Sequence, residues 1–146
     1  MDLSEQQRAF LGKNHSAAMI TLRADGTPHA VRVGVALVES KVWSSGIPSR
    51  LRTRHLRRDP RSTLFVFEPG WSWLALESTV TIHDGPDAAR MNLRLFQEMQ
   101  KDRGLPEGTL LWNNQQMTLD EFLQTMRDEQ RLIYEFAPTR VYGFGA

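Results

Sequence analysis

A series of short strand patterns joined by tight turns restricts the folds open to this chain. Asp25–Gly26 is a strong signal for a two-residue hairpin, because glycine tolerates the positive φ that such turns need. Glu39–Ser40 and Pro69–Gly70 indicate further tight turns. The strands between and around these turns are expected at residues 17–23, 28–38, 41–45, 62–68 and 71–83. Strands joined in this way form a β-meander, which favours an antiparallel barrel.

Helical patterns occur at the start of the chain and in its second half. Ser4–Gln7 and Thr118–Glu121 match capping boxes, so each is expected to open a helix. Residues 86–103 follow the 3.6-residue spacing of a helix, whereas residues 109–117 are ambiguous. The chain is then expected to close with strands at 131–136 and 141–144, separated by a turn at Pro138–Thr139. The sequence therefore predicts one α+β domain over residues 1–146, mainly β with helices.

The predicted strand from Ser62 to Glu68 is apolar on both faces. Such a strand belongs in the middle of a sheet or at an interface. A small barrel has little interior left for a second apolar face, so we expect a homodimer.

An arginine-rich helix is expected to start after Ser49, which is a good N-cap candidate, and to end at Asp59–Pro60. This interpretation makes Arg50 the first helical residue and Arg52 the third. Cations there oppose the helix macrodipole, whose N-terminus is positive. An anion bound by the free N–H groups and the arginines would remove the conflict, and phosphate is the usual one.

A helical wheel separates the arginines of this helix into two groups. Arg50, Arg54, Arg57 and Arg58 share one face, and the solvated-face interpretation is favoured for the last three. Arg52 falls on the inward face together with Leu51, His55 and Leu56. A guanidinium that faces inward is seldom buried without a partner.

Composition narrows the function classes. The chain has 18 Lys+Arg against 17 Asp+Glu and no cysteine. The balanced charge gives no overall attraction to nucleic acid or membrane, and cysteine-based metal sites and disulfides are excluded. No apolar run approaches the ~20 residues that span a bilayer, and the first residues lack signal-peptide features, so we expect a cytoplasmic protein.

Motifs for common chemistries are missing. The four histidines are scattered, which favours structural or surface roles over a metal site, and there is no nucleophile elbow or Gly-rich phosphate loop. Trp71 and Trp73 point to one side of their strand. They are interpreted either as core or interface residues, or as a wall for a flat ligand whose phosphate lies at Arg50 and Arg52.

Two sequence blocks resemble a known family. The turn from Ala24 to His29 and the block from Arg50 to Arg61 resemble the pyridoxamine 5'-phosphate oxidase-like split β-barrels, especially their flavin/deazaflavin oxidoreductases. Residues 131–143 are similar to the closing hairpin of that family. The resemblance implies an antiparallel split β-barrel of the FMN-binding type, and a homodimer that holds its cofactor in a groove between subunits. Arg52 stands where many deazaflavin binders have lysine.

The resemblance also implies a set of cofactor-binding residues. Phosphate contacts fall on Ser45, Arg50 and Arg52, with backbone N–H groups from the loop Gly46 to Ser49. Further implied contacts to the ring or the substrate pocket are Val31, Arg32, Val33, Trp71 and Trp73. No protein side chain need act as a catalytic acid or base, since the cofactor carries the hydride.

The functional prediction is an oxidoreductase that uses coenzyme F420 to transfer a hydride to or from a small conjugated substrate. FMN is the alternative cofactor. Two other hypotheses remain: a non-catalytic flavin- or deazaflavin-binding protein, and a dimer whose arginine helix binds a nucleic acid or an acidic partner.

Overall fold

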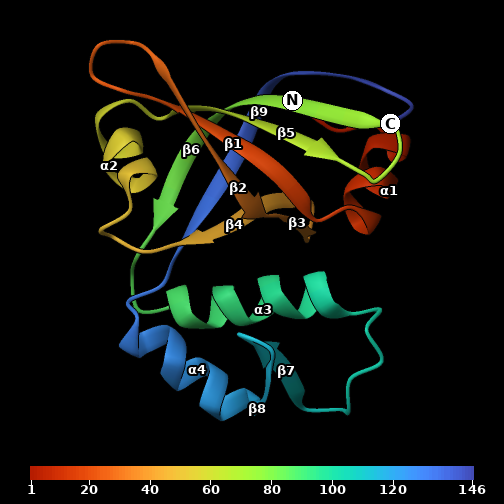
Figure 1. The fold of residues 1–146 in the computed structure, drawn as a ribbon, viewed down its shortest axis with the longest axis vertical. Helices are drawn as coiled ribbons and strands as arrows, with labels where there is room; N and C mark the ends of the chain where they lie inside the picture. The colour runs from red at the N-terminus through yellow and green to blue at the C-terminus, as the bar shows by residue number, and fades with distance from the viewer.

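A computed structural model describes residues 1–146, and its main element is one curled antiparallel sheet (Figure 1). The sheet has seven strands in the order β2-β1-β5-β6-β9-β4-β3. The strands are β1 (Ser16–Leu22), β2 (Pro28–Gly34), β3 (Ala36–Val38), β4 (Lys41–Gly46), β5 (Arg61–Phe67), β6 (Trp73–His83) and β9 (Leu132–Phe144). The predicted mainly β, antiparallel class is confirmed.

The sheet curls around an apolar interior. β2 is the first strand in this order, and β4 is the last but one, next to β3. The two strands nevertheless meet, because the Ser44 hydroxyl of β4 donates to the Gly34 carbonyl at the end of β2 at 2.7 Å. Alternate residues of each strand point inward, so residues such as Met19, Leu64 and Leu76 are fully buried in the core. The other face of β1, β5, β6 and β9 points outward.

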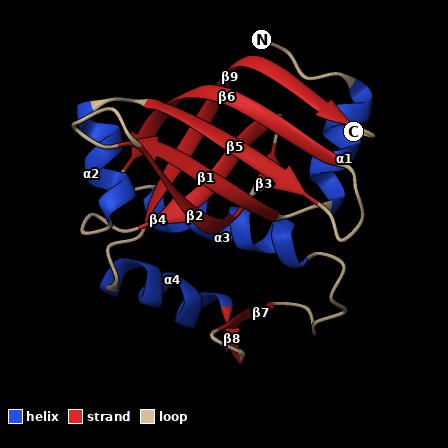
Figure 2. Cartoon of the chain, turned by 45° about the horizontal axis from the view of Figure 1, so that its top comes forward, coloured by secondary structure: helices blue, strands red, loops and turns tan.

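Four helices lie around the sheet: α1 (Glu5–Lys13), α2 (Leu51–Arg58), α3 (Ala88–Gln100) and α4 (Leu119–Asp128). Both predicted capping boxes are present, at the starts of α1 and α4. α3 and α4 form a separate layer with the short hairpin of β7 (Thr109–Trp112) and β8 (Gln115–Thr118), below the sheet in Figure 1 and also in Figure 2. Phe96, Trp112 and Phe122 pack together in this layer, with ring centroids 5.3 to 5.8 Å apart.

Several elements differ from the sequence predictions. The strand expected at 71–83 begins at Trp73, so Trp71 lies in the turn before β6 and does not share a strand with Trp73. The predicted strand 28–38 is divided into β2 and β3, where the Val35 N–H donates to the His15 carbonyl at 2.9 Å. The ambiguous residues 109–117 form the β7–β8 hairpin, whose turn residues Asn113 and Asn114 have φ of 50° and 62°. The predicted turn at Pro138–Thr139 is wrong, because β9 continues through it with a register shift that accommodates the proline.

The start of α2 also differs from the prediction. Arg50, and not Ser49, is the N-cap residue, and no side chain caps the helix. Leu51 was expected to face inward but is 50% exposed. Thr53 is buried instead, and its hydroxyl bonds to the Ile47 carbonyl and to the Tyr134 hydroxyl. A polar partner beneath the helix therefore selects threonine at the inward position, where periodicity alone favours an apolar residue.

No helix in the structure is long and apolar enough to cross a membrane.

Candidate anion and cofactor site

β4 and α2 bring Ser45 and Arg52 together. The Arg52 guanidinium turns inward beneath the first turn of α2, where it donates to the Ser45 carbonyl at 3.3 Å. Its Cζ lies 5.7 Å from the centroid of the Tyr134 ring. The Nε of Arg52 is buried and has no hydrogen-bond partner. A buried cationic donor of this kind is costly unless an acceptor reaches it.

The electrostatics of this site favour an anion. Burial lowers the pKa of Arg52; Tyr134 partly offsets this, and the charges of Arg50 and Arg131 lower the pKa further. The N-terminus of α2 lacks a capping side chain and adds its own partial positive charge. An anion bound here would meet free N–H groups, the unpartnered Arg52 donor and neighbouring cations. These features fit the phosphate of a flavin or deazaflavin cofactor.

The end of β4 is covered by α3. The Ser45 hydroxyl donates to the Asn92 side-chain carbonyl at 2.5 Å, and the fully buried Asn92 amide donates to the Ala88 carbonyl at 2.9 Å. A Cβ at Gly46 would overlap the Tyr134 hydroxyl, so only glycine fits there. The helical layer thus lies directly against Ser45, one of the predicted phosphate-site residues.

The remaining predicted residues near this site are divided between surface and core. Ser49 and Arg50 are exposed at the rim, where they are accessible to a ligand. Val31 and Val33 point into the barrel, and Val33 is buried in the core. Arg32 points outward and donates to the Ser16 hydroxyl at 3.3 Å. Of these three β2 residues, only Arg32 presents its side chain to the outer face.

Trp71 and Trp73 lie far from the arginines within one chain. Trp73 pairs with Phe67 at the far end of β5, whereas Arg61 starts β5 just after α2. The length of β5 separates the two ends by about 20 Å at ~3.4 Å per residue. Trp73 stacks on Phe65 at 5.1 Å, and Trp71 is 89% exposed in the preceding turn. One chain alone does not bring the tryptophans to the anion site.

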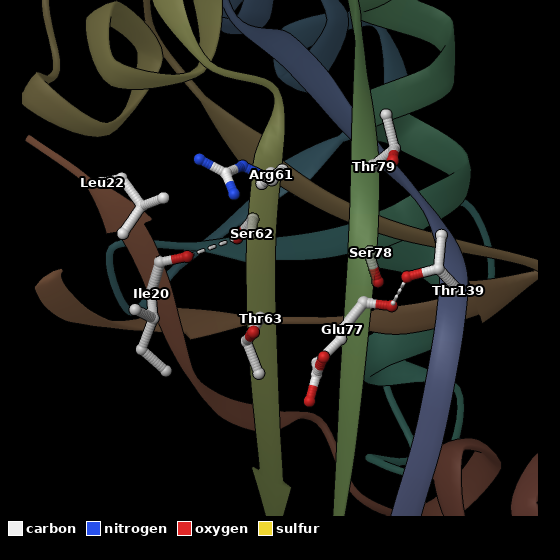
Figure 3. A pocket seen from close by; sticks show the side chains of 9 residues that line it. All are labelled: Ile20, Leu22, Arg61, Ser62, Thr63, Glu77, Ser78, Thr79 and Thr139. Carbon is white, nitrogen blue, oxygen red and sulfur yellow. Dashed lines mark hydrogen bonds between the residues drawn. The ribbon is translucent and has the colours of Figure 1, made fainter. Parts of the chain in front are cut away.

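The outer face of the sheet also holds a polar cavity that the sequence analysis missed (Figure 3). Its volume is about 450 Å³, and Arg61, Thr63, Glu77 and Thr79 point into it from β5 and β6. Thr139 reaches it from β9, and its hydroxyl donates to the Glu77 carbonyl at 3.1 Å. In the sequence, this cavity could have been inferred from the polar residues at the outward positions of two otherwise apolar strands.

A histidine pair is the second feature that sequence reasoning missed. His29 of β2 and His55 of α2 meet edge to face with ring centroids 5.1 Å apart. The Thr21 hydroxyl hydrogen-bonds the Nδ1 of His55 at 2.9 Å, and His55 is buried. Burial lowers the pKa of His55, and the nearby His29 and Arg58 lower it further. This pair anchors α2 to the β1–β2 hairpin, and no group of three or more ligands surrounds it.

The outer arginines of α2 are more engaged than a solvated face implies. Arg57 forms an ion pair with Asp84 at 2.9 Å, with both side chains about half exposed. Arg58 donates to the Leu22 carbonyl. Both contacts connect the helix to the ends of neighbouring strands, and Arg54 remains exposed without an ion pair.

The sequence of this chain matches a known protein family and is similar to a reductase. The family model described as "Pyridoxamine 5'-phosphate oxidase" matches residues 3–144. An F420H(2)-dependent biliverdin reductase from Mycobacterium tuberculosis (strain CDC 1551 / Oshkosh) is 31% identical over 112 residues, which cover 75% of this chain and 81% of that protein.

Solved structures share the fold over nearly the whole chain. A conserved hypothetical protein from Mycobacterium tuberculosis superimposes with a TM-score of 0.74 at 18% identity, over 97% of this chain and 84% of the other. A protein described as an F420 reductase has a TM-score of 0.66 at 17% identity, over 96% and 98% of the two chains. The predicted split-barrel fold is confirmed by these neighbours. With a family match that runs from α1 to the end of β9, the chain belongs to the pyridoxamine 5'-phosphate oxidase family of split β-barrel proteins.

Proposed function

We propose that this protein is an oxidoreductase that binds coenzyme F420 and transfers a hydride to or from a small conjugated substrate. The observation that carries the proposal is the buried Arg52 guanidinium, whose Nε lacks a partner at the uncapped start of α2. The phosphate of a flavin or deazaflavin would satisfy that donor. The 31% identical relative is named an F420H(2)-dependent reductase, which favours F420 over FMN.

The residues of this chain would bind, orient and shield the cofactor. Arg50, Arg52 and the loop from Gly46 to Ser49 would bind the phosphate, while α3 keeps water from the end of β4 through Asn92. When bound, the deazaflavin or flavin ring supplies the hydride chemistry, which needs no acid or base from the protein. The relative named a biliverdin reductase supports a conjugated substrate.

We further propose that two copies of the chain complete the site. An aromatic patch on the outer face comprises Phe65, Phe67, Trp73, Tyr142 and Phe144, and Trp71 is exposed in the turn that precedes Trp73. Tyr142 and Phe144 are 43% and 64% exposed, which is unusual for large apolar residues on a soluble surface. In the proposed dimer, a second copy packs across this outer face, and the tryptophans of one chain border the site formed by the arginines of the other.

Titration with both cofactors tests the proposal. Purified protein from a host that makes no deazaflavin is titrated with F420 and with FMN, and absorbance and tryptophan fluorescence are recorded. We expect saturable binding of F420, with quenching that diminishes in a Trp71→Phe/Trp73→Phe double variant. FMN binding in preference to F420 would favour the alternative cofactor, and no binding of either would refute the proposed function.

A further inference from the structure

Tyr134 lies beneath the proposed phosphate site, although it is far from that site in the sequence. It belongs to β9 and pairs with Ser44, the residue before Ser45 on β4. Its side chain is fully buried, and its hydroxyl lies directly against Gly46, where the loop after β4 begins. The guanidinium of Arg52 lies over the same ring, with its Cζ 5.7 Å from the centroid. Tyr134 therefore contacts both the start of the loop and the arginine beyond its far end.

A relay of two hydroxyl groups connects Tyr134 to this loop. Thr53, the third residue of α2, is fully buried and donates its hydroxyl proton to the Ile47 carbonyl at 2.7 Å. A threonine hydroxyl has one proton, so the hydrogen bond between Thr53 and Tyr134 must use the proton of Tyr134. The Ile47 carbonyl also accepts from the Arg50 N–H at 3.3 Å. The relay therefore runs in one direction, from β9 through α2 to the loop that leads to Arg50.

This relay fixes the first turn of α2 without a capping side chain. The N–H groups of Thr53 and Arg54 donate to the Arg50 carbonyl at 3.1 and 3.2 Å. The N–H groups of Leu51 and Arg52 donate to no acceptor in the chain, because no side chain caps the helix. A capping side chain would bind a first-turn N–H group itself. Thr53 instead holds the turn from below, so two N–H groups stay available to an anion.

We propose that Tyr134 and Thr53 are positioning residues of the phosphate site. Their relay holds the loop after β4 and the first turn of α2 so that the free N–H groups and the Arg52 guanidinium converge on one phosphate. The proposal rests on the proposed function, because it concerns the site assigned there to the cofactor phosphate. Both residues are fully buried, so their hydroxyls act on the donors and do not bind the phosphate themselves. Loss of either hydroxyl should weaken every ligand that binds through a phosphate.

The test titrates F420 and FMN into wild type and a set of hydroxyl variants. Tyr134→Phe and Thr53→Val should each raise the Kd of every ligand that wild type binds by roughly 3- to 10-fold, the equivalent of one hydrogen bond. The double variant should bind as weakly as the weaker single variant and no worse, since both changes act through one relay. Thr53→Ser keeps the hydroxyl and should bind within about twofold of wild type. Tyr134→Phe keeps the buried ring and should fold, so its Kd decides even where Thr53→Val is unstable.

Ser44→Ala is the matched control, because Ser44 pairs with Tyr134 but donates its hydroxyl to the Gly34 carbonyl of β2, away from α2. It should lower the melting temperature as the relay variants do, and leave the Kd values within about twofold. Lower melting temperatures in the relay variants with unchanged Kd values would assign the two hydroxyls to stability alone. Additive losses in the double variant, or no rescue by Thr53→Ser, would also overturn the inference. Each of these results leaves the proposed function standing, whereas wild type that binds neither ligand would refute both.

Discussion

Replacing Arg52 with methionine distinguishes the effect of its charge on the stability of the free protein from its effect on cofactor affinity. In the free protein the change removes one hydrogen bond to the Ser45 carbonyl, which costs on the order of 1 kcal/mol. It also removes a partly buried cation whose Nε has no partner, and that relieves a desolvation penalty of similar size. Methionine keeps the packing against Tyr134. We therefore expect the free energy of unfolding to stay within about 1 kcal/mol of wild type.

The effect on ligand binding should be much larger. Loss of a charge-assisted hydrogen-bonded pair costs about 1.5–3 kcal/mol, which corresponds to roughly 10- to 150-fold in the dissociation constant. At a cofactor concentration 100 times its wild-type Kd, ligand binding stabilises the wild-type fold by about 2.7 kcal/mol, or roughly 5–10 °C in Tm for a chain of this size. Arg52→Met should lose most of that ligand-induced shift.

Thermal melts with and without F420, together with a fluorescence titration, measure both quantities on the same samples. Arg54→Met is the matched control, because Arg54 lies on the same helix but is exposed and unpaired. A free protein destabilised by more than about 2 kcal/mol, combined with an unchanged Kd, would show that Arg52 is satisfied within the chain. The phosphate site would then have to be placed elsewhere.

Three further predictions concern the scaffold. Phe65→Glu, in the exposed aromatic patch, should convert a dimer of twice 16.7 kDa into a monomer in light scattering; a wild-type monomer at micromolar concentration would refute the shared site. Gly46→Ala should lower the free energy of unfolding by about 1–3 kcal/mol in denaturant melts, because its Cβ meets the Tyr134 hydroxyl; an unchanged midpoint would contradict this. The lowered pKa of His55 means that the unfolded chain binds the proton more readily, so stability should fall as the pH drops below about 6.5. His55→Gln should flatten that dependence, and an equally steep profile would assign it to other groups.

The amino-acid pattern alone was sufficient for several local features. Asp25–Gly26 marks a turn because Gly26 adopts a φ of 84° and the Asp25 carboxylate accepts from the Thr27 N–H at 3.0 Å. The loop is longer than the predicted two-residue hairpin, since the strand pairing ends at Leu22 and Pro28 and the Arg23 N–H donates to the Thr27 carbonyl. Both capping boxes formed because each bonds residues three apart in the chain. The inward direction of Arg52 also followed from helical periodicity. These features depend on neighbours within a few residues, which the sequence displays directly.

Contacts between distant segments were decided by the tertiary structure. Thr53 replaced Leu51 at the inward position of α2 because Tyr134, 81 residues later in the chain, presents a hydroxyl there. Arg131 lies near Arg52 because β9 pairs with β4, and Ser45 is covered by α3, whose Asn92 accepts its hydroxyl hydrogen bond. The distance between Trp73 and α2 follows from strand length and sheet order. Periodicity describes which way a side chain points, but the partner that it meets is set by how the sheet curls and how its strands pair.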